Sequence, residues 1–326
     1  MPDIFCAGSV ARRIFESAQK GSAFHAYLVT GPKGSGKSRF AMEAGAALLC
    51  SEKEKPCGGC ASCKMAYSKH HPDFLLIAPD DAGSIRIKQV RFLLEELSRC
   101  AFYGGWRAIA IARAETMTSE AQNCLLKTLE EPPKKTCFFL LAASYEVMLP
   151  TIRSRCVHVR MEAMDEGALV QLLIKEGTDE NEARQIARIS GGVPGAALEL
   201  LADKKGDGRL WSVRKGMLEL ILSFKGLPSL PAAQNHFRSI REDAEFALSC
   251  MASFCRDMLM IKAGCEALAE NIDALPRLRR TSETFTKGQL GDIIDLILQA
   301  KKQLAANVNY ALAVDMLFIS ASEVLI

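Results

Sequence analysis

Gly31-Pro-Lys-Gly-Ser-Gly-Lys-Ser38 matches the phosphate-binding pattern G-x-x-x-x-G-K-[ST] at every constrained position. A short apolar run, 26–30 (AYLVT), precedes it, and residues 39–49 (RFAMEAGAALL), which are rich in helix formers, follow it. A strand that passes through a glycine loop into a helix directs backbone N–H groups and the positive end of the helix dipole at one point. The stretch therefore predicts a phosphate site in an α/β domain. The alternative is a glycine turn before a helix.

The pattern also assigns individual roles within a site for ATP or ADP with Mg²⁺. Lys37 is expected to reach the β- and γ-phosphates, and Ser38 to hold the Mg²⁺. The expected nucleotide-binding residues are Gly31, Pro32, Lys33, Gly34, Ser35, Gly36, Lys37 and Ser38.

Length and composition bound the number of domains and the environment. At 326 residues the chain exceeds the about 100–200 residues of an ordinary domain, so we expect two or three domains. The net charge of +3 permits nucleic acid as a partner without indicating it. Residues 1–15 lack the pattern of a signal peptide, and no run approaches the roughly 18 apolar residues of a membrane span. We therefore expect a cytoplasmic protein without a membrane partner.

A cysteine-rich segment follows the helix expected after the phosphate loop. It is polar, contains two overlapping C-x-x-C pairs, and holds Cys50, Cys57, Cys60 and Cys63. Four thiolates suffice for a closed, structural Zn²⁺ site, which we predict here. The alternatives are buried reduced thiols or a redox pair. His70 and His71 are near enough in sequence to compete as ligands, but we expect both to be exposed polar residues.

Strands and helices are expected to alternate up to residue 160. The expected strands are 26–30, 73–78, 107–112, 136–143 and 157–160, and the expected helices include 8–20 and 85–97. The first helix has apolar residues at helical spacing, at Val10, Ile14 and Ala18. Ser119 with Gln122 predicts a capping box for a further helix. This alternation predicts a mainly parallel sheet covered by helices on both faces, with His158 as an edge residue rather than a catalyst.

No strand is expected beyond Met161. Residues 165–201 predict short helices around Gly191-Gly-Val-Pro-Gly195, and 208–326 predicts helices throughout, with Gly206-Asp-Gly208 as a joint. We expect a nucleotide-binding domain at 1–161 with the cysteine segment 50–63 as an insertion, a small helical domain at 162–207 and an all-α domain at 208–326. The last domain suits a bundle or packing against partner helices.

The acids of a phosphate-loop hydrolase are hard to find in this chain. Hydrolysis needs a carboxylate that supports Mg²⁺ and a group that polarises water. The 107–112 strand ends with Ala112 and Arg113 where an Asp-Glu pair is expected. Asp80 and Asp81 follow another apolar strand, and Glu115 is a weaker candidate. A self-sufficient ATPase that uses these acids is one hypothesis.

Several further segments carry a resemblance to a known family. Besides the phosphate loop and the four cysteines, these are Asn123-Cys-Leu-Leu-Lys-Thr-Leu-Glu-Glu-Pro-Pro133, Leu149-Pro-Thr-Ile-Arg-Ser-Arg-Cys156 and Asn307-Val-Asn-Tyr-Ala-Leu312. From about residue 8 to the C-terminus, the chain resembles the δ′ subunits of the bacterial DNA polymerase III clamp loader. The resemblance implies an AAA+ nucleotide-binding domain, a small helical lid and a helical collar that holds five subunits in a ring.

The resemblance also implies how the subunit works. Arg155 would reach the ATP site of a neighbouring subunit, and its alternative is a surface salt-bridge residue. The strand ending at Ala112 would lie beside the phosphate-loop strand, Asp80 and Asp81 would lie away from it, and Gly195 would stand near the place where motor subunits carry an arginine. The implied function is a stator that helps load the sliding clamp onto primer-template DNA, with little or no ATPase activity of its own. The alternative is a self-sufficient ATPase or a motor subunit of the same loader.

Overall fold

The computed structural model describes residues 9–103, 105–223, 235, 237, 239–305 and 309–325. Residues 307 and 308 of the C-terminal motif lie outside this part of the chain. Contacts divide the chain into two compact units, one of Met1–Ala168 with Val193–Ala196 and one of Leu169–Gly192 with Ala197–Ile326. Each unit has its own hydrophobic core.

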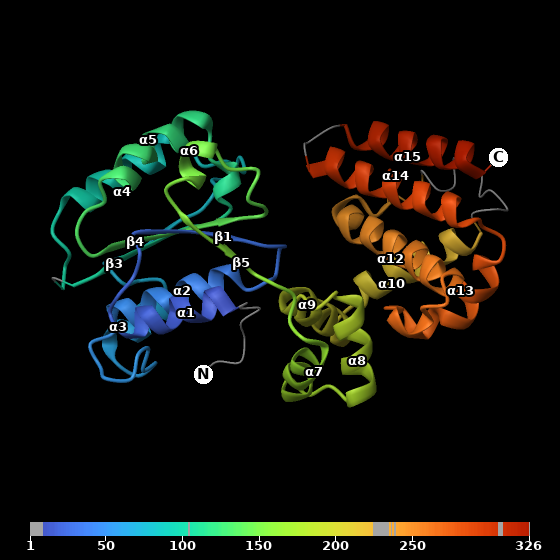
Figure 1. Ribbon diagram of the computed structural model, residues 1–326, viewed down its shortest axis with the longest axis horizontal. Helices are drawn as coiled ribbons and strands as arrows, with labels where there is room; N and C mark the ends of the chain where they lie inside the picture. Colours follow the sequence, from blue (N-terminus) through green and yellow to red (C-terminus); the bar gives the residue numbers. More distant parts are fainter. Residues whose placement is uncertain are drawn as a thin grey trace. The chain divides into compact units, whose positions relative to one another are not determined.

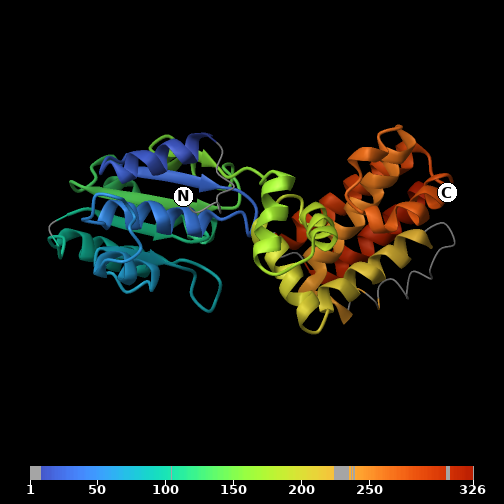
Figure 2. The same ribbon diagram turned by 90° about the horizontal axis from the view of Figure 1, so that it is seen from below.

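The first unit is built on a five-stranded sheet in the order β2-β3-β4-β1-β5. Every pairing is parallel, and the strand arrows in Figure 2 point the same way. The strands are β1 (Ala26–Thr30), β2 (Phe74–Ile77), β3 (Arg107–Ile111), β4 (Thr136–Ala142) and β5 (Val157–Arg160). The predicted parallel sheet is confirmed, and His158 does lie on an edge strand.

The strand order corrects one expectation. The strand that leads to Ala112 and Arg113 is β3, and it does not lie beside the phosphate-loop strand β1 because β4 pairs with both. The strand before Asp80 and Asp81 is β2, which lies at the far edge as expected. The order of parallel strands depends on how the crossover helices pack, which the pattern of one chain does not encode.

Helices cover both faces of the sheet. Figure 1 shows α1 (Ser9–Gln19), α2 (Lys37–Leu49) and α3 (Ala61–Tyr67) on one face, and α4 (Ile87–Ser98), α5 (Ser119–Glu130) and α6 (Pro150–Arg153) on the other. The second group shares a core with the sheet, in which Leu93, Leu125 and Phe138 are buried. Because helices cover both faces of the sheet, its strands must be apolar along nearly their whole length. In β4, for example, every residue is buried.

Two local predictions, the cap of α5 and the buried face of α1, were wrong by about one residue. Thr118, not Ser119, caps α5, because its side chain accepts a hydrogen bond from the Ala121 N–H at 3.3 Å. In α1 the buried residues are Ala11, Phe15 and Ala18, whereas Val10 is 41% exposed. Successive residues of an α-helix are rotated by about 100°, so an error of one position in the predicted buried face is enough to place an exposed residue on it.

In the described residues of the second unit, all regular secondary structure is helical. The helices are α7 (Glu166–Lys175), α8 (Glu180–Ile189), α9 (Pro194–Lys205), α10 (Arg209–Leu222), α12 (Ala244–Lys262), α13 (Leu275–Ser282), α14 (Lys287–Ala305) and α15 (Tyr310–Leu325), with short 3₁₀ turns η3 (Arg241–Asp243), η4 (Glu266–Leu268) and η5 (Ile272–Ala274). The first residues of α7 and of α9 belong to the first unit. In the first unit, a further 3₁₀ turn, η1 (Ala114–Thr116), follows β3. The central helix is α12, whose Met251, Phe254 and Met258 are fully buried in the core of the second unit.

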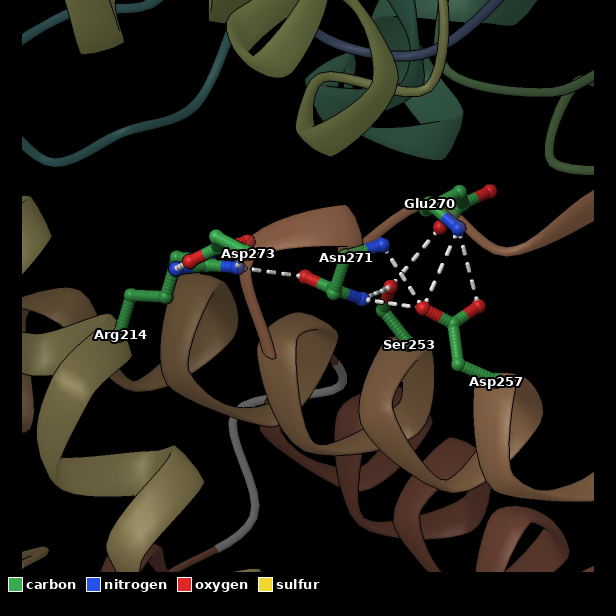
Figure 3. Close-up of polar contacts among 6 residues, drawn as sticks. All are labelled: Arg214, Ser253, Asp257, Glu270, Asn271 and Asp273. Atoms are coloured by element: carbon green, nitrogen blue, oxygen red, sulfur yellow. Dashed lines mark hydrogen bonds and ion pairs between the residues drawn. The ribbon is translucent and has the colours of Figure 1, made fainter. Parts of the chain in front are cut away.

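A buried polar network fixes the segment between α12 and α13 (Figure 3). The Asp257 carboxylate, fully buried on α12, accepts from the backbone N–H groups of Glu270, at 3.1 Å, and of Asn271, at 2.8 Å. It also accepts from the Asn271 side-chain amide at 2.8 Å. Arg214 of α10 donates to the Asn271 amide oxygen at 2.9 Å and pairs with Asp273 at 2.8 Å. The network joins α10, α12 and the 270–273 segment.

We expect Asp257→Ala to destabilise the second unit by about 3 kcal/mol, because it removes the acceptor of three donors and each buried unpaired donor costs roughly 1–3 kcal/mol. Thermal unfolding of the full chain, with amide hydrogen exchange at Glu270 and Asn271, measures this. Asp295→Ala removes an exposed carboxylate from α14 and is the control. Equal melting temperatures and equal exchange in the two variants would show that the network is dispensable.

Candidate functional site

The phosphate loop has the strand-loop-helix geometry that its sequence predicts. It leaves β1 at Thr30 and enters α2 at Lys37, and Gly34 and Gly36 have φ of 83° and 89°, a region that favours glycine. Gly36 is the N-cap of α2, and no side chain caps the first turn. The free N–H groups of that turn and the helix dipole form a site for an anion, so this loop fits the phosphates of a nucleotide.

Lys37 and Ser35 lie inside the loop. The Lys37 ammonium donates to the carbonyls of Gly31 at 2.6 Å and Pro32 at 2.8 Å, so its side chain folds back over the loop. Burial lowers the pKa of Lys37, and the nearby carboxylate of Glu115 opposes that shift. The Ser35 side chain is 1% exposed, and its hydroxyl has no hydrogen-bond partner in the described chain. Ser38 is exposed at the start of α2, where an ion bound to the phosphates can reach it.

Of the candidate acids, the structure brings only Glu115 toward the loop. Asp80 accepts from the N–H groups of Ala82, at 3.1 Å, and Ser84, at 3.2 Å, so its carboxylate closes its own turn beyond the edge strand. Glu115 lies on η1 after β3, and its Oε2 atom is buried without a hydrogen-bond partner in the described chain. Its interaction with Lys37 places its charge near the loop.

The segment around Gly195 packs directly on the phosphate loop. The Gly195 N–H donates to the Gly34 carbonyl at 2.9 Å, and a Cβ atom at Gly195 would stand 2.6 Å from the Gly34 Cα atom. That separation is too short for any side chain unless the two segments move apart. An arginine at this position would therefore not fit the arrangement seen here.

The four predicted cysteines come together in space. Their sulfur atoms all lie within 4.8 Å of one another, with 3.9 Å between Cys50 and Cys60 and 4.0 Å between Cys57 and Cys63. Four thiolates at about 2.3 Å from a central Zn²⁺ would be separated by about 3.8 Å in a tetrahedron, so the donor set and its spacing fit Zn²⁺. Cys50 ends α2, Cys60 caps α3 and Cys63 lies within α3, so a metal would join both helices to the loop that carries Cys57.

The polypeptide around the cluster supplies hydrogen bonds to sulfur. The Cys60 N–H donates to the Cys57 sulfur at 3.3 Å, and this bond is the main reason that the pKa of Cys57 falls to about 7. Burial raises the pKa of Cys63 to about 12. A bound Zn²⁺ would deprotonate both thiols, because thiolate is its ligand form.

The two histidines near the cluster have different environments. His70 is exposed, as expected, but the expectation for His71 was wrong, since His71 is 3% exposed. Its Nε2 atom is 2.9 Å from the Ser62 hydroxyl, and its Nδ1 accepts from the Asp73 N–H at 3.0 Å. Both ring nitrogens are thus used in positioning α3 and the start of β2. His71 is not part of the described group of side chains that could hold a metal ion, which consists of the four cysteines.

Arg155 follows the short helix α6 and lies at the surface. Its guanidinium donates to the Thr151 carbonyl at 2.8 Å and to the Ser154 hydroxyl at 3.1 Å, and it forms an ion pair with Glu130 of α5 at 2.6 Å. Glu130 and Arg155 line a hollow of about 690 Å³ together with His25 and Leu129. Cys156 stays a neutral thiol, because burial raises its pKa to about 12.

Arg155 and the phosphate loop lie at opposite ends of the sheet. β1 and β5 are parallel, with Tyr27 opposite Val157 and Thr30 opposite Arg160. The loop therefore follows the carboxyl ends of these strands, whereas Arg155 precedes their amino ends. Five residues of extended chain span roughly 16 Å, which exceeds the reach of an arginine side chain. Arg155 is thus too far from the phosphate loop of its own chain to touch a nucleotide bound there.

Sequence reasoning missed the partner of Arg155. Glu130 carries a signal of its own, because a carboxylate in the last turn of a helix faces the negative end of the helix dipole. A nearby cation would offset this unfavourable interaction, and in the structure Arg155 is that cation. The contact between Gly34 and Gly195 carried no comparable signal, since it joins residues far apart in the chain.

Comparison with known proteins finds similar sequences among the subunits of DNA polymerase III. The model of a family described as "DNA polymerase III, delta subunit" matches residues 7–165. The chain is 30% identical to DNA polymerase III subunit delta' of Bacillus subtilis over 92% of this chain and 91% of that protein. It is 31% identical to subunit delta' of Escherichia coli, over 90% of this chain and 86% of that protein. A solved structure of a DNA polymerase III gamma subunit-related protein from Thermotoga maritima has a TM-score of 0.49 and 19% identity, and it covers 97% of this chain and 99% of its own.

Proposed function

The chain belongs to the delta' subunit family of DNA polymerase III, and from that premise we propose that it is the stator of a clamp loader. In this role it helps to load a sliding clamp onto primed DNA and supplies Arg155 in trans to the ATP site of a neighbouring subunit. The observation that carries the proposal is the position of Arg155, at the surface and at the end of the sheet opposite its own phosphate loop. An arginine at this position can contact the phosphate of a bound nucleotide only if that nucleotide is bound to another chain.

The proposal includes the architecture that the assembly needs. Residues 1–161 are the AAA+ nucleotide-binding domain, 162–207 the lid and 208–326 the collar that joins this chain to motor and δ-type subunits in a ring of five. The clamp and the primer-template DNA are reached through the complex, in the cytoplasm. No described helix is both long and apolar enough to cross a bilayer.

The phosphate loop of this chain is proposed to bind ATP or ADP with Mg²⁺ and to hydrolyse little or none of it. The cradle and Lys37 are present, but Ala112 and Arg113, which follow β3, bring no acid, and β4, the strand between β3 and β1, ends at Ala142 without one. Gly195, which packs on the backbone of Gly34, supplies no charged side chain at the loop. Binding without turnover suits a subunit that holds the ring together while its neighbours hydrolyse ATP.

A second candidate function is favoured by Glu115. Its buried, unpartnered carboxylate oxygen near Lys37 could support Mg²⁺, which would make the chain a self-sufficient ATPase or a motor subunit of the same loader. The two functions differ in what the chain does alone. Phosphate release by the isolated wild-type chain at about 1 s⁻¹ or faster, lost in Glu115→Gln, would favour the second.

We expect Lys37→Ala to weaken nucleotide binding by the isolated chain by roughly 10- to 100-fold, because a hydrogen bond to a charged group contributes about 1.5–3 kcal/mol. Calorimetric titration with ADP and Mg²⁺ measures this. In a loader reconstituted with its motor and δ-type subunits, the same variant should keep most of the DNA- and clamp-stimulated ATP turnover, since hydrolysis takes place at other sites.

Lys33→Ala is the matched control, because Lys33 is an exposed lysine of the same loop at a position that the pattern leaves open. It should bind nucleotide as the wild type does. Omission of this chain should abolish clamp loading onto primed DNA. Loading that proceeds equally well without the chain would contradict the stator function, and turnover lost with Lys37→Ala would contradict the non-hydrolysing role.

A further inference from the structure

The guanidinium of Arg155 is already engaged within its own chain. One terminal nitrogen donates to the Thr151 carbonyl at 2.8 Å and to the Ser154 hydroxyl at 3.1 Å. The other is 2.6 Å from Oε1 of Glu130. A phosphate that binds end-on to the guanidinium accepts from both terminal nitrogens at once. In this conformation, which we call withdrawn, that end of the guanidinium is held by groups of its own chain rather than open to a phosphate from another.

Glu130 is not placed where it would stabilise its own helix. It is the last residue of α5, and a negative charge there opposes the helix dipole. The next residue, Glu131, is also exposed. The backbone N–H of Glu131 donates to the Lys127 carbonyl at 3.0 Å, which is the last hydrogen bond of the helix. The Glu130 side chain is 49% exposed and that of Arg155 33%, so both stay in contact with water at the wall of the hollow.

We propose that Glu130 is a positioning residue that holds Arg155 in a withdrawn conformation until a neighbour's nucleotide competes for it. The inference rests on the proposed in-trans role of Arg155. An ion pair this exposed is weak, so a terminal phosphate, which carries more charge than one carboxylate, can take the guanidinium from it. The exchange makes engagement of Arg155 depend on the phosphate and keeps the arginine ordered in the free subunit.

The first test measures the availability of Arg155 in the isolated full chain. Modification by phenylglyoxal, followed peptide by peptide with mass spectrometry, reports how readily the reagent reaches this arginine. We expect Glu130→Gln to raise the modification rate of Arg155 by up to about fivefold, the equivalent of the roughly 1 kcal/mol that an exposed pair can contribute. Glu131→Gln removes the adjacent exposed carboxylate and should leave the rate unchanged. An equal rate in wild type and Glu130→Gln would overturn the inference.

The second test uses the reconstituted loader and separates the inference from the function on which it rests. Glu130→Gln should raise ATP turnover in the absence of DNA, and the increase should vanish when Arg155→Ala is added. An increase that persists in the double variant would overturn the inference, because Glu130 would then act through another group. If Arg155→Ala alone leaves turnover unchanged, the in-trans role fails, while the modification rates still decide whether Glu130 withdraws the arginine.

Discussion

Purified wild-type chain is expected to carry about one equivalent of zinc, and Cys57→Ser less than about a tenth of that, because a closed structural site needs all four thiolates. The largest structural effect should fall on residues 51–60. These residues are exposed or half-exposed, so burial of apolar surface contributes little to their fold. We therefore expect the segment to become susceptible to limited proteolysis in the variant. Metal analysis after preparation without chelator, with mapping of the cleavage sites, measures both effects.

Cys57 is the most informative of the four positions. It is exposed, so its replacement by serine removes a ligand without disturbing packing, whereas Cys50 and Cys63 are buried. Cys100→Ser, at an exposed cysteine outside the cluster, is the control and should retain zinc. The sheet should stay intact in both variants, since its core does not include the 51–60 segment.

Two results would count against this site. Less than about half an equivalent of zinc in the wild type would indicate that the cysteines are reduced thiols or a redox pair. Zinc retained by Cys57→Ser would indicate a different ligand set.

The sequence predicted the class of the fold well because its signals are local. The phosphate loop, the apolar runs of the strands and the intervening helices each occupy a short window, and together they require a parallel sheet. The order of the strands, by contrast, is not encoded by local signals. That β4 rather than β3 lies beside β1 follows from packing between segments more than 100 residues apart, and neither periodicity nor resemblance placed it correctly.

The candidate sites divide in the same way. The cysteine cluster and the phosphate loop are coded by spacing within a few residues, and the structure brings their members together where the sequence placed them. The environments of His71, Glu115 and Glu130 depend on contacts that form only in the folded chain. His71 was expected to be exposed because its neighbours are polar, yet its ring is buried against Ser62 and Asp73.

Arg155→Ala is expected to lower the DNA- and clamp-stimulated ATPase of the reconstituted loader. A guanidinium stabilises the charge that develops on the γ-phosphoryl oxygens, in a site from which water is partly excluded. Elsewhere such an arginine contributes roughly 10³–10⁵ to the rate, so turnover at the neighbour's site should almost stop. Total turnover should fall less, to the share of the other sites, because they keep their own arginines. Steady-state phosphate release, with single-turnover measurements to resolve the slow site, detects the difference.

The matched variant is Arg155→Lys, which keeps the charge but loses the planar fork of donors, so it should restore little of the rate. Both variants should leave the fold, nucleotide affinity and ring assembly of this chain nearly unchanged, because the side chain is at the surface and its pair with Glu130 is exposed. Assembly is checked by gel filtration before any rate is compared. If the Arg155→Ala ring assembles and hydrolyses ATP at the wild-type rate, Arg155 is only a surface salt-bridge residue. Its place at the amino ends of the strands, away from its own phosphate loop, would then need another explanation.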